Sequence, residues 1–190
     1  MPKPRIGLLG GSFNPAHEGH RHISLEALKR LGLDEIWWLV APQNPLKPVA
    51  GMASLAQRLA QAAALAGHPR IRALDLETRF GTHYTADTIA ALQARFPRTR
   101  FVWLMGADNL AQIRRWKDWQ AIFARVPIAV FARPTYCRRA LAELAAQRFA
   151  RMRVSPRTRR FSASEPPAWV FLPVKLDPHS ATAIRSPRRS

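Results

Sequence analysis

The chain is poor in cysteine, because Cys137 is alone among 190 residues and no disulfide can form within the chain. A chain without disulfides suits a reducing compartment, so we expect the protein in the cytoplasm. Long apolar runs are also missing, since no charge-free segment approaches the ~18 residues that a membrane-spanning helix needs. Residues 1–5 lead straight into a short apolar strand and not into the core and cleavage site of a signal peptide. We therefore expect neither a disulfide framework nor a membrane anchor.

Acidic residues are scarce as well. The chain carries 12 Asp and Glu against 30 Lys and Arg, which gives a formal net charge of +18 at pH 7. Such a surplus raises the local concentration of anions, whether nucleotides or nucleic acid. A solvated, arginine-rich surface with no partner has the same composition, so charge alone leaves the function open.

Short apolar segments alternate with helical patterns along the chain. This alternation is typical of βαβ units and therefore of an α/β fold with a parallel sheet. We expect strands at 6–9, 36–40, 71–74, 101–105, 128–131 and 169–173. We expect helices at 19–31, 54–66, 86–96, 119–124 and 138–149. The length fits a single domain over residues 1–190.

The segment 150–168 differs in composition from the rest of the chain. It combines arginines with serines and prolines, which favours an exposed, mobile loop. A last strand follows it, and a helix start is expected at Ser180 in the short C-terminal segment.

The clearest chemical pattern directly follows the first expected strand, where Gly10 and Gly11 open the segment GGSFNPAHEGH. The two glycines let the backbone turn tightly and bring its N–H groups close to a ligand. A helix that begins near Gly19 directs its free N–H groups and positive dipole end at the same place. His17 and His20, three residues apart, can both donate to phosphate oxygens. The segment therefore predicts an anion site at the carboxyl end of a parallel strand.

Other phosphate and metal motifs do not fit this segment. A Walker P-loop requires Lys-Ser/Thr after its second glycine, and a dinucleotide fingerprint requires G-x-G-x-x-G; neither is present. A zincin motif H-E-x-x-H would place histidine where Arg21 stands. A metal site made by His17, His20 and His22 has no cysteine or carboxylate cluster to support it. We therefore expect no metal bound by the protein alone.

Two segments resemble the motifs of a known superfamily. The turn from Gly10 to His20 resembles the H-x-G-H signature of the adenylyl- and cytidylyltransferases, in the form G-G-[ST]-F-[DN]-P-x-H-x-G-H. The segment 180–185, SATAIR, resembles the second signature of these enzymes, S-x-T-x-x-R. The resemblance implies a Rossmann-like, doubly wound parallel sheet in three α/β/α layers.

Within this superfamily the chain most resembles the bacterial nicotinate-nucleotide adenylyltransferases, over nearly its whole length. The closer match lies in 42–47 (PQNPLK), in 84–88 (YTADT) and in 106–109 (GADN) with Trp116 beyond it. Phosphopantetheine adenylyltransferases usually have threonine where His17 stands. The resemblance implies that ATP and nicotinic acid mononucleotide are the substrates and that Mg²⁺ arrives with ATP.

The resemblance also implies roles for individual residues. The residues implied in catalysis are His17, His20 and Arg185. Those implied in ATP binding are Gly10, Gly11, Ser12, Phe13, Gly106, Asp108, Ser180, Thr182 and Ile184. Those implied in binding the mononucleotide are Asn44 and Lys47 at its phosphate, and Thr85 and Trp116 at its pyridine ring.

Several alternatives stay open at this point. Asp108, Thr85 and Ser180 can each serve only as a helix N-cap, and Trp116 only as a core aromatic. The acceptor can be nicotinamide mononucleotide or another phosphate instead of the nicotinate compound. A basic nucleic-acid-binding protein on a nucleotide-binding fold is a distant alternative, because no RNA- or DNA-binding motif accompanies the charge. We expect no nucleic-acid or membrane partner, and a homo-oligomer stays open.

Overall fold

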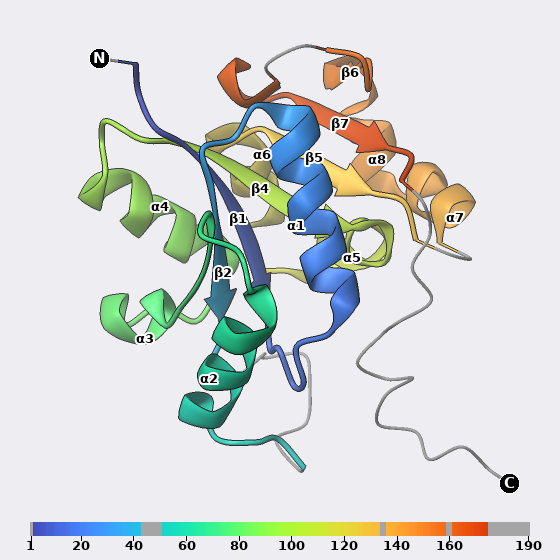
Figure 1. The fold of residues 1–190 in the computed structure, drawn as a ribbon. Coiled ribbons are helices and arrows are strands. Elements are labelled where there is room, and N and C mark those ends of the chain that lie inside the picture. The colour runs from blue at the N-terminus through green and yellow to red at the C-terminus, as the bar shows by residue number, and fades with distance from the viewer. Residues whose placement is uncertain (1, 43–50, 134–135, 159–160, 175–190) are drawn as a thin grey trace, which may run out of the picture.

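The computed structural model describes residues 2–42, 51–133, 136–158 and 161–174 (Figure 1). Seven strands form one sheet in the order β3-β2-β1-β4-β5-β7-β6, and every neighbouring pair is parallel. The strands are β1 Arg5–Gly11, β2 Glu35–Val40, β3 Ile71–Leu74, β4 Arg100–Gly106, β5 Ile128–Phe131, β6 Arg153–Val154 and β7 Trp169–Leu172. The predicted α/β fold with a doubly wound parallel sheet is confirmed.

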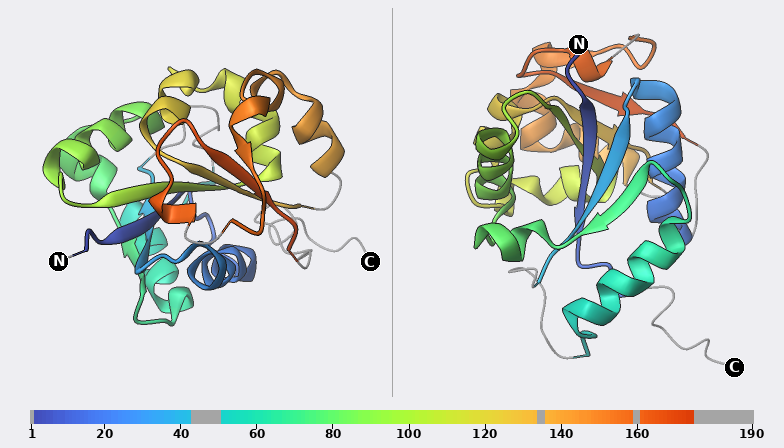
Figure 2. Two further views of the ribbon diagram at one scale, coloured as in Figure 1. Left: turned by 90° about the horizontal axis from the view of Figure 1, so that it is seen from above. Right: turned by 60° about the vertical axis from the view of Figure 1, so that its left-hand side comes forward.

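Helices cover both faces of this sheet (Figure 2). One face is covered by α1 Glu18–Leu31 and α2 Leu55–Ala66. The other face is covered by α3 Leu76–Phe80, α4 Thr85–Arg95, α5 Ala107–Gln112, α6 Trp119–Arg125, α7 Cys137–Ala142 and α8 Leu144–Arg148. Three short 3₁₀ turns complete the elements: η1 Ile113–Arg115, η2 Ala150–Met152 and η3 Phe161–Ala163.

Strand residues divide between two cores because successive side chains point to opposite faces of a sheet. In β1, Leu8 belongs to the core beneath α4 and α6, whereas Leu9 belongs to the core beneath α1 and α2. Both side chains are buried, as expected for a sheet that is covered on both faces. The short apolar strands of the sequence follow from this double burial.

Local signals set the ends of the helices on the α1 side. Ser54 and Gln57 form a reciprocal cap at the start of α2, where the Ser54 hydroxyl accepts from the Gln57 N–H at 3.2 Å. The helices α1 and α2 end at Gly32 and Gly67, whose φ angles of 68° and 50° lie in the left-handed region that favours glycine.

The predicted helix over 138–149 is wrong as one continuous element. The chain breaks at Glu143, where φ of −75° and ψ of 156° are extended values, and two shorter helices result. The helices α3 and α5 were not expected from the sequence. Both have at most six residues, which is too short for a helical pattern to be recognised.

The predicted exposed loop over 150–168 is also wrong for part of its length. Phe161 and Ser162 are buried, and the Ser162 hydroxyl donates to the Gly32 carbonyl at 3.2 Å. Arg153 and Val154 form β6, which pairs with β7. The many arginines favoured an exposed loop. Phe161 nevertheless lies in the core beneath α1 and α2 and holds this segment on the protein.

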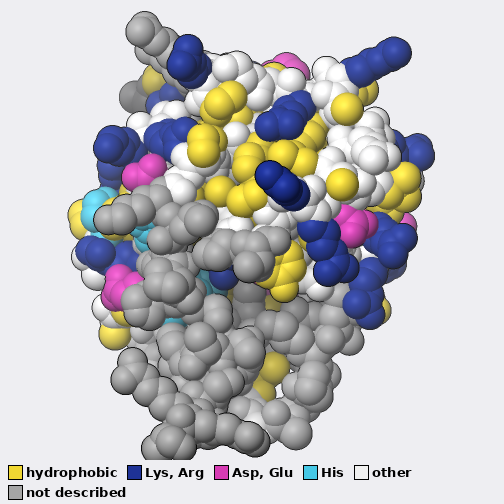
Figure 3. All heavy atoms as spheres, turned by 90° about the vertical axis from the view of Figure 1, so that its right-hand side faces the viewer, with side chains coloured by type: hydrophobic (Ala, Val, Ile, Leu, Met, Phe, Trp, Pro, Cys, Tyr) yellow, Lys and Arg dark blue, Asp and Glu magenta, His cyan; other side chains and the backbone are white. Residues whose placement is uncertain are grey.

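The surface is strongly basic on the face shown in Figure 3, where Lys and Arg side chains outnumber Asp and Glu. None of the helices in the described part of the chain has the length and hydrophobicity needed to span a bilayer.

Glu77 is a buried carboxyl group on α3, with 7% of its surface exposed. Burial raises its pKa from 4.5 to about 7, because the charged form loses its hydration. The folded protein therefore retains this proton at pH values where the unfolded chain has lost it. The contribution of Glu77 to the free energy of unfolding therefore falls as pH rises from about 4.5 to about 7, and levels off above that.

We expect Glu77→Gln to be more stable than the parent at pH 8 and equally stable at pH 4.5. The difference at pH 8 should reach up to about 3 kcal/mol, because a shift of about 2.5 units is worth that much. Thermal melts at both pH values measure it. Glu165→Gln, at an exposed glutamate, is the control for losing one carboxylate. A Glu77→Gln advantage that is the same at both pH values would contradict the assignment.

Candidate active site

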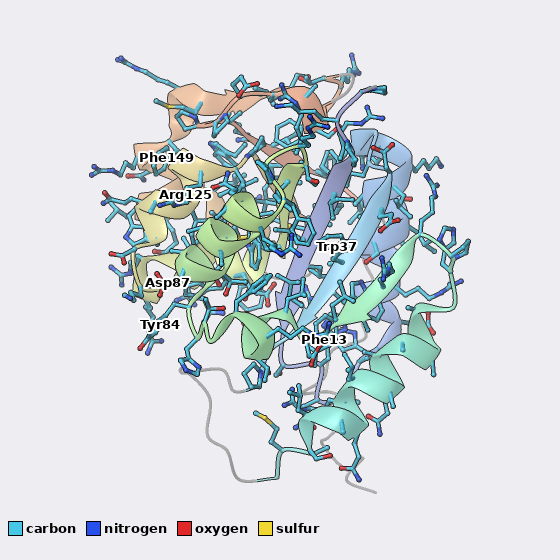
Figure 4. All side chains as sticks on the ribbon, turned by 90° about the vertical axis from the view of Figure 1, so that its left-hand side faces the viewer. Phe13, Trp37, Tyr84, Asp87, Arg125 and Phe149 are labelled. Carbon is cyan, nitrogen blue, oxygen red and sulfur yellow. The ribbon has the colours of Figure 1, made fainter. Side chains whose placement is uncertain are left out.

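The candidate site lies where the sheet reverses its winding, at the carboxyl ends of β1 and β4. From β1 the chain continues to β2 and β3 on one side, and from β4 it continues to β5 and β7 on the other. Ligands of open α/β sheets bind in the crevice at such a reversal point. Figure 4 shows Phe13 at this end of the sheet, with Tyr84 and Asp87 at the start of α4 near the same end. Most residues predicted for the site follow one of these strands.

Two of the predicted glycines lie where an added Cβ would crowd other side chains. A Cβ at Gly10 would lie 2.6 Å from the Trp103 ring of β4, and a Cβ at Gly106 would lie 2.7 Å from Arg133 Nε. Atoms cannot approach so closely without displacing their neighbours. The absence of a side chain at these two strand ends therefore leaves room for Trp103 and Arg133 beside the backbone.

The turn after β1 is held by the buried ring of Phe13. Its φ of 45° is positive, which is rare outside glycine and requires support from the surroundings. The ring stacks on Trp38 with centroids 5.2 Å apart and lies 4.6 Å from the ring of His20. The side chain of Phe13 is thus committed to packing, and its backbone remains the part that can face a nucleotide.

His17 and His20 lie together at the start of α1, as the sequence predicts. His17 is the N-cap residue, and the two rings have centroids 3.8 Å apart. The backbone N–H of His17 donates to Nδ1 of His20 at 3.2 Å. In a neutral imidazole that accepts at Nδ1, the proton resides on Nε2. Nε2 of His20 is therefore the ring atom that can donate to a phosphate oxygen.

Asp108 lies in the first turn of α5, directly after β4. The N-cap of this helix is Gly106, so the alternative that Asp108 is only the N-cap is wrong. Its Oδ1 lies 3.2 Å from Arg133 Nε, in an ion pair without hydrogen-bond geometry. Arg133 follows β5, and the sequence analysis did not identify it.

Trp116 is half-buried and packs edge-on against Trp103, with ring centroids 6.3 Å apart. Trp103 is the same side chain that lies beneath Gly10, so one ring connects the end of β1 with Trp116. The indole Nε1 of Trp103 is buried and has no hydrogen-bond partner in the described part of the chain. Trp116 thus packs on the core while one part of its ring stays exposed.

Thr85 is the first residue of α4, and Tyr84 is its N-cap. The alternative that Thr85 is the N-cap itself is therefore wrong. The neighbouring residue of Trp116, Lys117, lies 3.1 Å from the Asp87 carboxylate and 4.8 Å from the centre of the Tyr84 ring. The hydrogen bond to Asp87 raises the pKa of Lys117. These contacts bring the start of α4 next to the segment that carries Trp116.

Six of the predicted site residues lie outside the described residues: Asn44, Lys47, Ser180, Thr182, Ile184 and Arg185. Within the described ranges, no three or more His, Cys, Asp or Glu side chains come together in a way that could hold a metal ion.

Sequence analysis missed several residues that shape the site. Asn14 stands inside the quoted motif, and its side chain bonds to the Gly51 carbonyl and the Ala53 N–H. Trp103 and Arg58 gave no signal, because their roles depend on partners far away in the sequence.

Comparison with known proteins identifies the family of the chain. Residues 8–186 match the model of the cytidylyltransferase-like family. A probable nicotinate-nucleotide adenylyltransferase of Cereibacter sphaeroides is 54% identical over 184 residues, which cover 97% of this chain and 98% of that protein. One from Bradyrhizobium sp. is also 54% identical, with 96% of each chain covered.

The fold has a solved counterpart in Plasmodium falciparum nicotinic acid mononucleotide adenylyltransferase complexed with NaAD. The TM-score is 0.73 at 16% identity, with 96% of this chain and 82% of that chain covered. At this identity the likeness speaks for the fold alone. The family-model match and the relatives at 54% identity show that the chain belongs to the nicotinate-nucleotide adenylyltransferases of the cytidylyltransferase-like family.

Proposed function

We propose that this chain transfers the adenylyl group of ATP to nicotinic acid mononucleotide, giving nicotinic acid adenine dinucleotide and pyrophosphate. The observation that carries the proposal is the pair His17 and His20 at the N-terminus of α1, beside the glycine turn of β1. This arrangement presents N–H donors and a positive helix end to phosphate. The relatives at 54% identity, named for the same activity, support it.

The chemistry requires little from the protein except placement and charge. A phosphate oxygen of the acceptor attacks the α-phosphorus of ATP, a P–O bond forms, and the bond to the β-phosphate oxygen breaks. Because a phosphate monoester has a second pKa of about 6, the nucleophile is ionised at neutral pH without a general base. The remaining tasks are to align two polyanions and to neutralise charge on the departing pyrophosphate.

On the ATP side, we assign His20 to the α-phosphate, where its Nε2–H can donate as negative charge builds. We assign His17 to the phosphates beside it. Asp108 would accept a ribose hydroxyl, and Arg185, with Ser180 and Thr182, would hold the β- and γ-phosphates. Mg²⁺ would arrive with ATP and need few protein ligands. The backbone at Gly10, Gly11, Ser12, Phe13, Gly106 and Ile184 would line the nucleotide.

On the acceptor side, Asn44 and Lys47 would meet the phosphate of the mononucleotide. Trp116 would stack on the pyridine ring, and the start of α4 at Thr85 would receive the carboxylate. The first N–H groups of a helix have no partner within the helix, so they suit an anion. Asp87 is engaged with Lys117, which reduces its repulsion of a negatively charged ring substituent.

Product analysis tests the function directly. The protein is incubated with ATP, Mg²⁺ and either nicotinic acid mononucleotide or nicotinamide mononucleotide, and the products are separated by chromatography. We expect pyrophosphate and the nicotinate dinucleotide. Absence of pyrophosphate release with both acceptors would refute adenylyl transfer to a pyridine nucleotide.

Replacing His20 by alanine should lower kcat by at least ~10²-fold, the scale for losing a donor to transition-state charge. Circular dichroism should show an intact fold, because this residue is only partly buried and lies at the end of a helix. His68→Ala, at a histidine beyond the far end of α2, is the matched control and should retain full turnover. Near-normal turnover of the His20 variant would remove this residue from the mechanism.

Replacing Arg185 by alanine should raise the KM for ATP and lower kcat/KM. Lysine should restore only part of the loss, because a point charge cannot reproduce the planar fork of arginine on phosphate. Steady-state kinetics with ATP as the varied substrate measure both effects. If both variants matched the parent, the second motif would have no role in this chain.

We expect nicotinic acid mononucleotide to be strongly preferred over its amide counterpart. A carboxylate accepts from the N–H groups and hydroxyl at the start of α4, whereas the amide presents donors to donors. Thr85→Val should therefore change the ratio of kcat/KM for the two acceptors. Trp116→Ala should weaken both about equally, since stacking does not distinguish the substituents. Equal kcat/KM values for the two acceptors in the parent protein would overturn the assignment of the acid.

A further inference from the structure

Arg58 is a buried cation beside the candidate site. It lies on α2 with 1% of its surface exposed, and burial lowers the pKa of its guanidinium. Arginine nevertheless remains protonated in proteins. Among the ion pairs of the described residues, none includes Arg58.

Four backbone carbonyls satisfy this guanidinium. Nη1 donates to Ser12 at 2.6 Å and to Ala41 at 2.7 Å, Nη2 to Pro42 at 2.9 Å, and Nε to Ala53 at 2.9 Å. These carbonyls belong to three separate segments: the turn after β1, the end of β2 and the residues before α2. One planar group with five N–H donors can join all three, and no other side chain offers that geometry.

The hydrogen bond from Arg58 to the Ser12 carbonyl fixes the orientation of the Ser12–Phe13 peptide in the turn after β1. In a trans peptide the C=O and the following N–H point in opposite directions. Because the Ser12 carbonyl points at Arg58, the N–H of Phe13 points away from it. The Phe13 ring in turn contacts His20 at 4.6 Å between centroids. The guanidinium of Arg58 is therefore linked to His20, the proposed phosphate donor, through the Ser12–Phe13 turn and the Phe13 ring.

Asn14 makes a second connection between the same segments. Its Nδ2 donates to the Gly51 carbonyl at 3.4 Å, and its Oδ1 accepts from the Ala53 N–H at 3.2 Å. The Ala53 N–H thus donates to Asn14, and the Ala53 carbonyl accepts from Arg58. The turn after β1 and the approach to α2 are bound into one unit.

A structural role alone does not require a charge at this position. Burying a cation costs free energy, and an apolar side chain in a packed core is often at least as stabilising. A positive charge without a carboxylate partner adds to the potential that attracts anions at the turn above it. The fixed orientation of the turn and the added positive potential both favour the binding of phosphates.

We propose that Arg58 is a positioning residue for adenylyl transfer: it fixes the Ser12–Phe13 turn, and through it His20, and its charge strengthens phosphate binding at that turn. This rests on the proposed function of the site.

The experiment compares Arg58→Lys and Arg58→Met with Arg100→Lys. Arg100 lies at the start of β4, the opposite end of the sheet, and also donates to a carbonyl, that of Ala163 at 3.1 Å. Thermal melts first establish the temperature at which each variant is folded. At that temperature, kcat is measured with ATP, Mg²⁺ and nicotinic acid mononucleotide, and the Kd of inorganic tripolyphosphate is measured by calorimetry.

Both Arg58 variants should lose at least ~10-fold in kcat, since small displacements at a reacting centre have large effects. The methionine variant should weaken tripolyphosphate binding by at least ~5-fold, and the lysine variant by less, because lysine retains the charge. Arg100→Lys should change neither quantity. A role confined to stability would lower the melting temperature and leave kcat and Kd of the folded variants unchanged.

A folded lysine or methionine variant with kcat within twofold of the parent would overturn the proposal. Failure of both variants to fold would also overturn it, in favour of a purely structural role. If the parent releases no pyrophosphate, the proposed function fails instead. Tripolyphosphate binding needs no acceptor, so it still tests whether Arg58 strengthens phosphate binding. An unchanged Kd in the methionine variant would show that Arg58 does not.

Discussion

The close contact between Gly10 and the ring of Trp103 is the constraint on which the site depends. It joins β1 and β4, the two strands between which the sheet reverses its winding. A side chain at position 10 would displace the indole, and Trp116 packs against that same indole. The turn proposed to bind the nucleotide and Trp116, proposed to stack on the pyridine ring, thus pack against the same indole. Their separation is fixed by the packing of β4 and not by the loops alone.

The sheet and most helices could be predicted because they depend on local patterns. Short apolar runs such as 101–105 and glycine-terminated helices such as α1 are visible in the sequence itself. The first turn could be predicted because Gly10, His17 and His20 lie close together in the chain. Short elements such as α3 were missed because five residues contain too little periodicity. The anchored segment at Phe161 was missed because its burial depends on α1, over a hundred residues earlier.

The residues of the site that sequence analysis missed depend on contacts over long distances in the chain. Arg58 stands in an alanine-rich helix, where it shares a buried face with Ala62 and Ala66. Alanine is compatible with both exposed and buried faces, so the pattern did not reveal that this arginine points inward. Its four acceptors are backbone carbonyls, which carry no sequence information. The pair formed by Asp108 and Arg133 joins the ends of two strands and becomes visible only when those strands are adjacent.

The distribution of charge suggests how a strongly basic protein can remain selective. Exposed arginines attract any anion, and salt screens them. The groups at the candidate site act over shorter distances and in fixed directions: a helix N-terminus, a histidine with its proton on Nε2, and a buried guanidinium. Because such groups are oriented before the substrate arrives, little reorganisation is needed when charge develops. Under the proposed function, the surface charge would govern how often phosphates arrive, and the rigid turn after β1 would govern which of them react.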